Sequence, residues 1–287
     1  MRKLLILLVV LLALFNTVGA QHADTTQHKW LTKKNIVIGA IVYQQVTGAL
    51  VEYAWWWVDS LRTFHLEKDA FWNNYSLGMD KFGHFYISYL TFTAVNEAMR
   101  WAEFTPKQRL LTAVLVPTFW AISIEVGDAI SPYGFSLPDL AANLSGVGYG
   151  FLQEKIPYFQ NFNIKFGFWP TQVYRDQFPK KWAPTIDYNA HSYWLSVNVH
   201  KVLPKAWGKY WPELINLAVG YSIEDHYKPT MRRELLLGID LNLRALKTRS
   251  PGWTALRNVA NLVRIPSPGV KIPKGQEPTQ YKWLLLH

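Results

Sequence analysis

The segment Phe162-Asn163-Ile164-Lys165-Phe166-Gly167-Phe168 decides the fold, because the period of the apolar residues changes there. Its apolar residues alternate with Asn163, Lys165 and Gly167, which is typical of a β-strand with one buried face. Before Pro157 the apolar residues instead form longer runs that are typical of helices. The sequence therefore predicts an α+β protein, with a bundle of about four helices followed by a small antiparallel β-rich region.

Four uncharged runs in the first half predict the helices of this bundle. They are residues 36–51, 82–96, 110–124 and 140–153. Each run is shorter than the ~20 residues that a transmembrane helix needs, so mutual burial in a bundle is the simpler prediction. Insertion of tilted helices into a thin membrane is the alternative. Pro117 is expected to kink the third helix.

The second half contains three further segments with alternating apolar residues. They are residues 193–199, 214–223 and 234–243, and each is predicted to form a strand. The tail from Arg264 onward is rich in proline, so we expect it to be extended. Its apolar end, residues 283–287, either docks on the sheet or reaches lipid. The predicted domains are a helical domain over residues 21–157 and a β-rich region with an extended tail over residues 158–287.

Residues 1–20 have the organisation of a cleavable signal peptide. Arg2 and Lys3 precede an apolar run over residues 4–15, and the segment closes with the small residues Gly19 and Ala20. The apolar run is too short to cross a hydrocarbon core. We therefore expect the mature chain to work in the cell envelope of a bacterium with two membranes, in the periplasm or at the outer membrane.

The composition favours a membrane-associated partner. The chain has 30 Lys and Arg against 20 Asp and Glu, a net charge of +10, and removal of Arg2 and Lys3 leaves +8. The nearest acidic partners of an exported protein are anionic lipids or glycolipids rather than nucleic acid. The alternative is that the basic residues only keep the surface soluble. The 14 Trp and 15 Tyr, with clusters such as Trp55-Trp56-Trp57, suggest contact with a membrane interface.

The sequence contains no cysteine, which limits the kinds of covalent link and metal site that the chain can form. It excludes disulfides, thiolate metal ligands and a cysteine-linked lipid within these residues. No P-loop, Rossmann, nucleophile-elbow or H-E-x-x-H motif is present in the sequence. Any active centre must therefore be built from oxygen and nitrogen side chains that lie apart in the chain.

Three pairs of polar residues stand at the ends of the predicted helices. They are Asp80 with His84, Glu125 with Asp128, and Asp139 with Asn143. Residues three or four apart lie on one face of a helix, and the ends concerned meet if neighbouring helices are antiparallel. Burial of so many ionisable groups costs several kcal/mol unless they pair with one another or hold a cation. The sequence therefore predicts one polar cluster at one end of the bundle.

Histidine with carboxylates is a ligand set for a divalent metal such as Zn²⁺ or Mn²⁺. The predicted metal ligands are His84, Glu125, Asp128 and Asp139, and this metal is the one cofactor that the sequence suggests. The same cluster predicts acid–base catalysis by His84, Asp80, Glu125 and Asp139, with His84 oriented by Asp80 or Asp139. The alternative is that the acids only cap their helices.

The same residues carry a resemblance to a known family. Asp80-Lys81-Phe82-Gly83-His84-Phe85 fits D-K-x-x-H-F, residues 125–128 fit E-x-x-D, and residues 134–143 fit G-x-S-x-x-D-x-x-x-N. With these motifs, residues 72–155 resemble the YfiM-like family, domain of unknown function 2279. The resemblance implies an envelope location, a compact helical unit and a shared polar cluster that includes Lys81 and Asn143. It implies no particular reaction.

The motifs are also distantly similar to the VanZ-like membrane proteins, whose helices span the inner membrane. The signal peptide and the shorter apolar runs depart from that pattern, so this topology is not carried over. Three functions stay open. The first is an exported envelope protein of undetermined activity, associated with the outer membrane on its periplasmic side. The second is a metal- or His/carboxylate-dependent enzyme that acts on a lipid or glycolipid headgroup. The third is a scaffold that docks a protein partner on its sheet, in an oligomeric state that the sequence leaves open.

Overall fold

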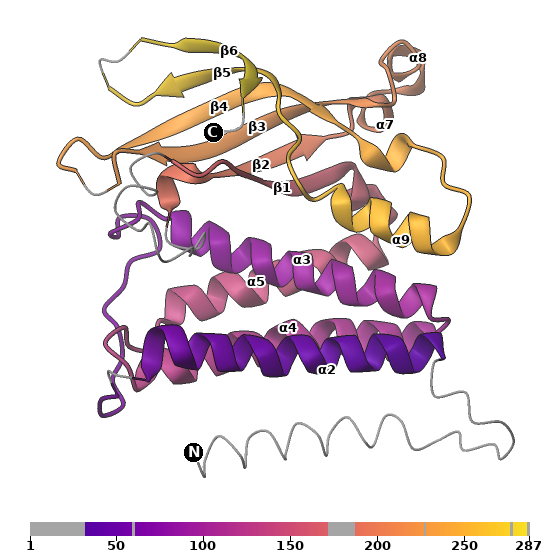
Figure 1. Ribbon diagram of the computed structural model, residues 1–287. Coiled ribbons are helices and arrows are strands. Elements are labelled where there is room, and N and C mark those ends of the chain that lie inside the picture. The colour runs from indigo at the N-terminus through magenta and orange to yellow at the C-terminus, as the bar shows by residue number, and fades with distance from the viewer. Residues whose placement is uncertain (1–31, 59–60, 172–186, 227, 276–277, 286–287) are drawn as a thin grey trace, which may run out of the picture.

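The chain folds into a layer of helices and a single antiparallel sheet (Figure 1). This computed structural model describes residues 32–58, 61–171, 187–226, 228–275 and 278–285. The predicted signal peptide therefore lies outside the described residues. Within them, four long helices precede the six strands along the chain, which confirms the predicted α+β class.

All four predicted helices are present, and each is longer than its uncharged run. They are α2 (Lys33–Glu52), α3 (Met79–Trp101), α4 (Pro106–Ala129) and α5 (Leu137–Lys155). Polar residues extend them because capping side chains satisfy the free N–H groups of a first turn. Thr105 and Gln108 form a capping box at the start of α4, and Ser136 accepts the N–H of Asp139 at the start of α5. Helix α4 continues through Pro117.

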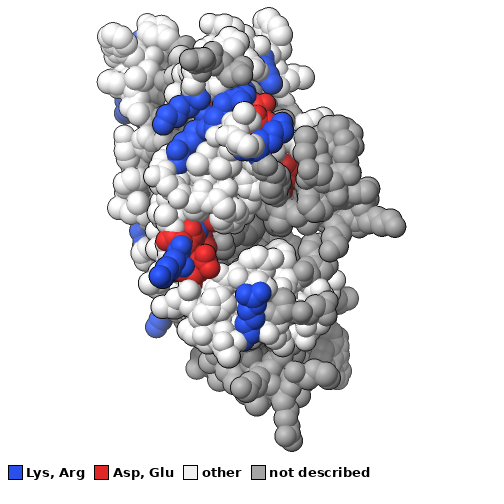
Figure 2. Space-filling model, turned by 90° about the vertical axis from the view of Figure 1, so that its left-hand side faces the viewer, with Lys and Arg blue, Asp and Glu red and all other residues white. Residues whose placement is uncertain are grey.

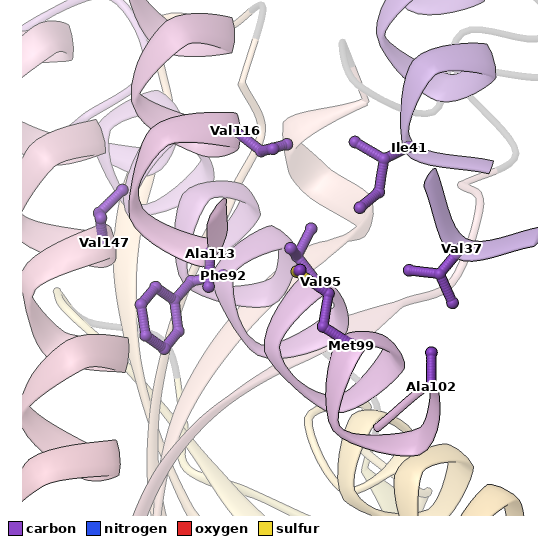
Figure 3. Close-up of a cluster of buried hydrophobic side chains, with 9 residues drawn as sticks. All are labelled: Val37, Ile41, Phe92, Val95, Met99, Ala102, Ala113, Val116 and Val147. Atoms are coloured by element: carbon purple, nitrogen blue, oxygen red, sulfur yellow. The ribbon is translucent and has the colours of Figure 1, made fainter. Parts of the chain in front are cut away.

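In Figure 1, α2 and α4 lie farthest from the sheet, while α3 and α5 lie between them and the sheet. The helices enclose a core (Figure 3) of nine buried side chains: Val37, Ile41, Phe92, Val95, Met99, Ala102, Ala113, Val116 and Val147.

A Cβ at Gly146 of α5 would lie 2.1 Å from the carbonyl oxygen of Phe85 in α3. Glycine is therefore what allows α3 and α5 to approach this closely.

Among the described helices, α4 alone is long and apolar enough to cross a membrane, and a third of its most apolar 18 residues are buried. Its outer surface carries exposed apolar side chains, namely Leu111, Leu115, Ile122 and Val126. Helices of this length and composition also occur in the cores of soluble proteins.

Six strands form the sheet, in chain order and each antiparallel to the next. They are β1 (Phe162–Phe168), β2 (His191–Val197), β3 (Ile215–Glu224), β4 (Arg232–Leu241), β5 (Ser267–Pro273) and β6 (Gln280–Leu285). The first four confirm the predicted strands. The tail beyond Arg264 is extended, as predicted, and of the two alternatives for its apolar end the structure shows docking, because β5 and β6 join the sheet. Proline is tolerated there because Pro268 lies at an irregularity in the register and Pro273 ends its strand.

Shorter elements connect the long ones. Helices α7 (Val199–Val202) and α8 (Lys205–Gly208) lie between β2 and β3, and α9 (Pro251–Ala260) lies between β4 and β5. Single turns of other helix types are η1 (Tyr53–Trp57), η2 (Pro157–Asn161), η4 (Tyr188–Ala190) and η5 (Leu243–Ala245). Helix α9 was not predicted, although Ser250 caps its first turn and Pro251 is its first residue.

The two faces of the sheet differ sharply in chemistry. On one face, Tyr193 and Ile223 pack against Tyr86 of α3. The register continues this face away from the helices with exposed apolar residues, namely Leu195, Leu217, Val219, Leu235, Leu237 and Ile239. The opposite face is buried and charged. There Asp240 binds Lys165 at 2.7 Å and Arg264 at 2.9 Å, which offsets the cost of burying all three.

Candidate functional site

The predicted polar pairs meet where α3 begins, α4 ends and α5 begins, at the left of Figure 1. The structure brings together Asp80, Lys81, His84, Glu125, Asp139 and Asn143. These residues come from three helices and are joined by Asp69 from the segment before α3. We call this group the polar cluster.

Lys81 is the centre of the polar cluster. Its ammonium lies 2.9 Å from a carboxylate oxygen of Asp80 and 2.6 Å from one of Asp139, and it also contacts Asp69. The side chain is 1% exposed. Burial lowers the pKa of this lysine, but the hydrogen bonds that it donates to Asp139 and Asp69 outweigh burial and raise the pKa above its usual value. Lys81 is therefore a permanent buried cation shared by three acids.

A tight turn before α3 holds Asp80 against this lysine. The side-chain oxygen of Asn74 accepts the backbone N–H of Ser76 at 3.2 Å and of Gly78 at 2.8 Å. The turn needs glycine because Gly78 has a φ of 89°. Asn74 and Ser76 then donate to the Asp80 carboxylate. Burial raises the pKa of Asp80, but the bonds from Ser76 and Lys81 lower it below its usual value, so this acid stays ionised.

Glu125 is in the opposite situation. It is 1% exposed, and one of its oxygens accepts the backbone N–H of Ser136 at 2.9 Å. Its second oxygen, Oε1, has no hydrogen-bond partner among the described residues. Burial raises the pKa of Glu125 to about 8, and the nearby charges of Asp139 and Asp128 act in the same direction. At neutral pH this carboxyl group is therefore mostly protonated.

His84 is oriented by α5 rather than by Asp80. Its Nδ1 lies 3.0 Å from the side-chain amide nitrogen of Asn143, and its Nε2 lies 3.6 Å from an oxygen of Asp139. Ser88 donates to the side-chain oxygen of Asn143 at 2.8 Å. Of the two partners predicted for His84, the structure thus selects Asp139, because Asp80 turns toward Lys81.

Two groups of three residues have the spacing of a cation site. In each group, one ligand atom per residue lies within 4.8 Å of the others, and the groups are His84 with Glu125 and Asp139, and Asp69 with Asp80 and Asp139. The ammonium of Lys81 contacts all three acids of the second group, so a cation already occupies that position. The first group includes the unpartnered oxygen of Glu125. It is therefore the better site for an ion.

Asp128, also predicted as a ligand, lies outside both groups. Its carboxylate accepts the indole N–H of Trp57 at 2.8 Å, and burial raises its pKa to about 6. Trp57 itself is buried, in contrast to the membrane contact suggested for its cluster. Burial also raises the pKa of Glu52 to about 8, with the charge of Asp128 as a second cause. Asp128, which is half-buried, and the buried Glu52 continue the acidic region from the polar cluster toward α2.

A cleft of about 900 Å³ lies against the polar cluster, within the size range of small-molecule sites. Its walls include Asp80, His84, Asp139, Tyr75 and Tyr188. The two tyrosine hydroxyls lie 3.0 Å apart, and burial raises the pKa of Tyr188 above its usual value. Figure 2 views this end of the molecule, where acidic side chains gather below a group of basic ones. The cleft is therefore lined by the aromatic rings of Tyr75 and Tyr188 and by the charged side chains of Asp80 and Asp139.

Reasoning from sequence missed Asp69 and Ser136 as members of the polar cluster. Asp69 follows Glu67 and Lys68 in a segment without helical or strand periodicity. Such a sequence is typical of an exposed loop, in which a charged residue needs no partner. Ser136 was recognised only as part of a helix start, yet its N–H binds Glu125 and its hydroxyl donates to Asp69 at 3.2 Å. The motif G-x-S-x-x-D was the one available signal for Ser136.

Comparisons with known proteins agree with an envelope location. Neither the curated proteins nor the solved structures contain a match to the chain. One family model matches, and its description is "Predicted periplasmic lipoprotein (DUF2279)". The word lipoprotein describes that family, whereas these 287 residues contain no cysteine. The match covers residues 70–155 and so includes every site residue predicted from sequence: this part of the chain is similar to a family of predicted periplasmic lipoproteins.

Proposed function

We propose that the chain is an exported envelope protein, associated with the outer membrane on its periplasmic side, whose functional centre binds one divalent cation through His84, Glu125 and Asp139. The family match and the signal-like N-terminus support an envelope location. One observation carries the cation site: Oε1 of Glu125 is a buried acceptor without a hydrogen-bond partner among the described residues, beside a histidine and a second carboxylate. A cation at this point satisfies that oxygen.

The donor set fits a borderline divalent ion. One imidazole and two carboxylates suit Zn²⁺ or Mn²⁺. Three protein ligands leave a position open, which is the arrangement of catalytic rather than structural zinc sites. The adjoining cleft is lined by His84 and Asp139, so the open position can face a ligand there. Because Glu125 is mostly protonated at neutral pH, cation binding releases its proton.

The residues around the three ligands hold them in place. Asn143 and Ser88 form a chain to His84, and both the amide and the hydroxyl can reverse their roles. The ring can therefore present a lone pair at Nε2 while Nδ1–H donates to the amide oxygen. Lys81 keeps Asp139 in position through its 2.6 Å contact. Such outer contacts fix the orientation of metal ligands and raise metal affinity.

A second candidate function is catalysis on the headgroup of a lipid or glycolipid. The open cleft of about 900 Å³ favours it, because a purely structural ion would need no access. In such a hydrolysis water displaces the headgroup fragment. Without an ion, His84 or Glu125 would transfer the proton; an ion held by His84, Glu125 and Asp139 would instead polarise a phosphate or ester oxygen. Release of a headgroup fragment from phosphatidylglycerol, measured with and without Zn²⁺ or Mn²⁺, tests this function.

Cation binding is tested by isothermal titration of the purified full chain with Zn²⁺ and with Mn²⁺. We expect one ion per chain and a loss of more than ~100-fold in affinity in Glu125→Gln and in His84→Gln, since removal of even an outer contact costs 10–100-fold. His200→Gln is the matched control, because His200 pairs with Glu213 outside the polar cluster. A wild-type chain that binds neither ion, or variants with unchanged affinity, would refute the site.

A further inference from the structure

An apolar groove of about 590 Å³ lies between the sheet and the helices α3 and α5. Its floor comes from three adjacent strands and includes Leu195, Val219 and Leu235, which are 39%, 47% and 45% exposed. Phe82 and Phe85 of α3, with Ser145 of α5, form its wall. The volume falls within the range of small-molecule sites, and the lining is that of a site for a hydrocarbon chain.

The groove has two cations at its rim. Arg233 and Lys274 both line it, and the N–H of Lys274 donates to the carbonyl oxygen of Arg233 at 2.9 Å. Neither forms an ion pair with a carboxylate among the described residues. The guanidinium of Arg233 instead donates to the carbonyl oxygen of Trp72 at 2.8 Å and to Asn73 at 2.9 Å, which are neutral partners. The neighbouring Lys271 is paired with Glu234. The positive charges without a carboxylate partner are therefore those of Arg233 and Lys274.

The floor of the groove continues into the exposed apolar face of the sheet. Leu217, Leu237 and Ile239 extend that face. At the sheet edge, Tyr281 and Trp283 of β6 are 83% and 86% exposed. Aromatic side chains of this kind concentrate at membrane interfaces, and exposed apolar patches mark contact surfaces. A hydrocarbon chain can thus pass from a membrane surface into the groove along a continuous apolar surface.

We propose that the groove binds one acyl chain of an anionic phospholipid, with the lipid phosphate against Arg233 and Lys274. The apolar floor contacts the acyl chain, and Arg233 and Lys274 at the rim bind the phosphate. None of the three cation ligands lines the groove. The lipid site therefore stands independently of the cation site, although Lys81 lines the groove and also contacts Asp139.

The test is native mass spectrometry of the full chain, purified free of lipid and titrated with short-chain phosphatidylglycerol below its micelle concentration. We expect one lipid per chain, with affinity rising about fourfold for each methylene added to the chain. Ser145→Trp fills the groove and should abolish binding. Leu144→Trp is the matched control, because Leu144 is exposed on the same helix but does not line the groove.

The rim is tested separately. Arg233→Gln and Lys274→Gln should each weaken phosphatidylglycerol binding about fivefold and leave phosphatidylcholine binding nearly unchanged. Lys209→Gln, outside the groove, is the control. Glycerol 3-phosphate alone should not bind; equal affinity for it would refute the acyl-chain site. Lipid binding that survives Ser145→Trp would also refute it.

A second copy of the chain is the competing occupant of this face. Light scattering with size-exclusion chromatography distinguishes it: a dimer that forms without lipid and that Ser145→Trp converts to a monomer would overturn the lipid proposal. His84→Gln should leave lipid binding intact, so a failure of the cation site and a failure of the lipid site can be told apart.

Discussion

Replacement of Glu125 by glutamine tests the electrostatics of the polar cluster most directly. Glutamine has nearly the same shape as glutamate, and its side-chain oxygen can accept the N–H of Ser136 as Glu125 does. The substitution therefore removes the titration and little else. The wild-type chain should lose stability relative to Glu125→Gln as the pH rises from about 5 to about 9.

The sign follows from proton binding. The pKa of Glu125 rises from 4.5 to about 8 on folding, so between these values the folded chain binds more protons than the unfolded one. Stability then falls as the pH rises. The difference between a pKa of 4.5 and one of about 8 corresponds to about 5 kcal/mol of folding free energy, at ~1.36 kcal/mol for each pKa unit. About 4 kcal/mol of it is expressed between pH 5 and pH 9, because the unfolded carboxyl group is already largely ionised at pH 5.

The assay is urea unfolding of both proteins at several pH values, in the presence of a chelator. The free energy of unfolding of the wild type minus that of Glu125→Gln should fall by about 4 kcal/mol across this range. Glu67→Gln, an exposed acid at the edge of the same cleft, is the control and should follow the wild-type curve. Zn²⁺ at pH 8 should restore stability to the wild type but not to Glu125→Gln.

A flat difference between the two proteins from pH 5 to pH 9 would refute the assignment of a protonated buried carboxyl group. A difference of the opposite sign would show that Glu125 is ionised in the folded chain at all these pH values. In either case a cation bound by Glu125 would not replace a proton there.

Four further outcomes follow from the same geometry. Lys81→Met leaves three carboxylates without their shared cation and should cost about 3–5 kcal/mol in urea unfolding; a neutral result would contradict the central role of this lysine. Gly146→Ala places a Cβ 2.1 Å from the carbonyl oxygen of Phe85 and should cost about 1–3 kcal/mol in thermal unfolding. Gly148→Ala meets nothing within 4 Å and should stabilise by about 0.5–1 kcal/mol, so equal effects of the two glycine variants would show that the helices are not in this contact. Asn143→Ala removes the contact that orients His84 and should weaken Zn²⁺ binding about 10–100-fold in titration calorimetry, whereas unchanged binding would mean that the ring needs no such support.

The gathering of the polar pairs was predictable because helix geometry places residues three or four apart on one face and short connections make neighbouring helices antiparallel. The partner of each side chain within the polar cluster was not predictable. Asp80 was expected beside His84, yet a turn built on Asn74 and Gly78 directs it to Lys81. Such a turn depends on one side chain bonding to backbone groups further along the chain, which no periodicity reveals.

The faces of the sheet illustrate the same limit. Alternation predicted a strand over residues 234–243 correctly, and an apolar face is normally the buried one. In the structure the apolar side chains Leu235 and Leu237 are exposed, while Glu234 and Asp240 are buried. The reason is that Arg264 and Lys271 lie on the charged face and pair with these acids.

The sequence by itself determined the order and type of the main elements, the helix caps and the end of the bundle at which the polar residues collect, since all of these depend on local spacing and backbone preference. Only the tertiary structure decided which acids share Lys81, which oxygen of Glu125 is left without a partner, and which face of the sheet is covered. Those outcomes depend on contacts between segments far apart in the chain, and burial then sets the charge state of each group.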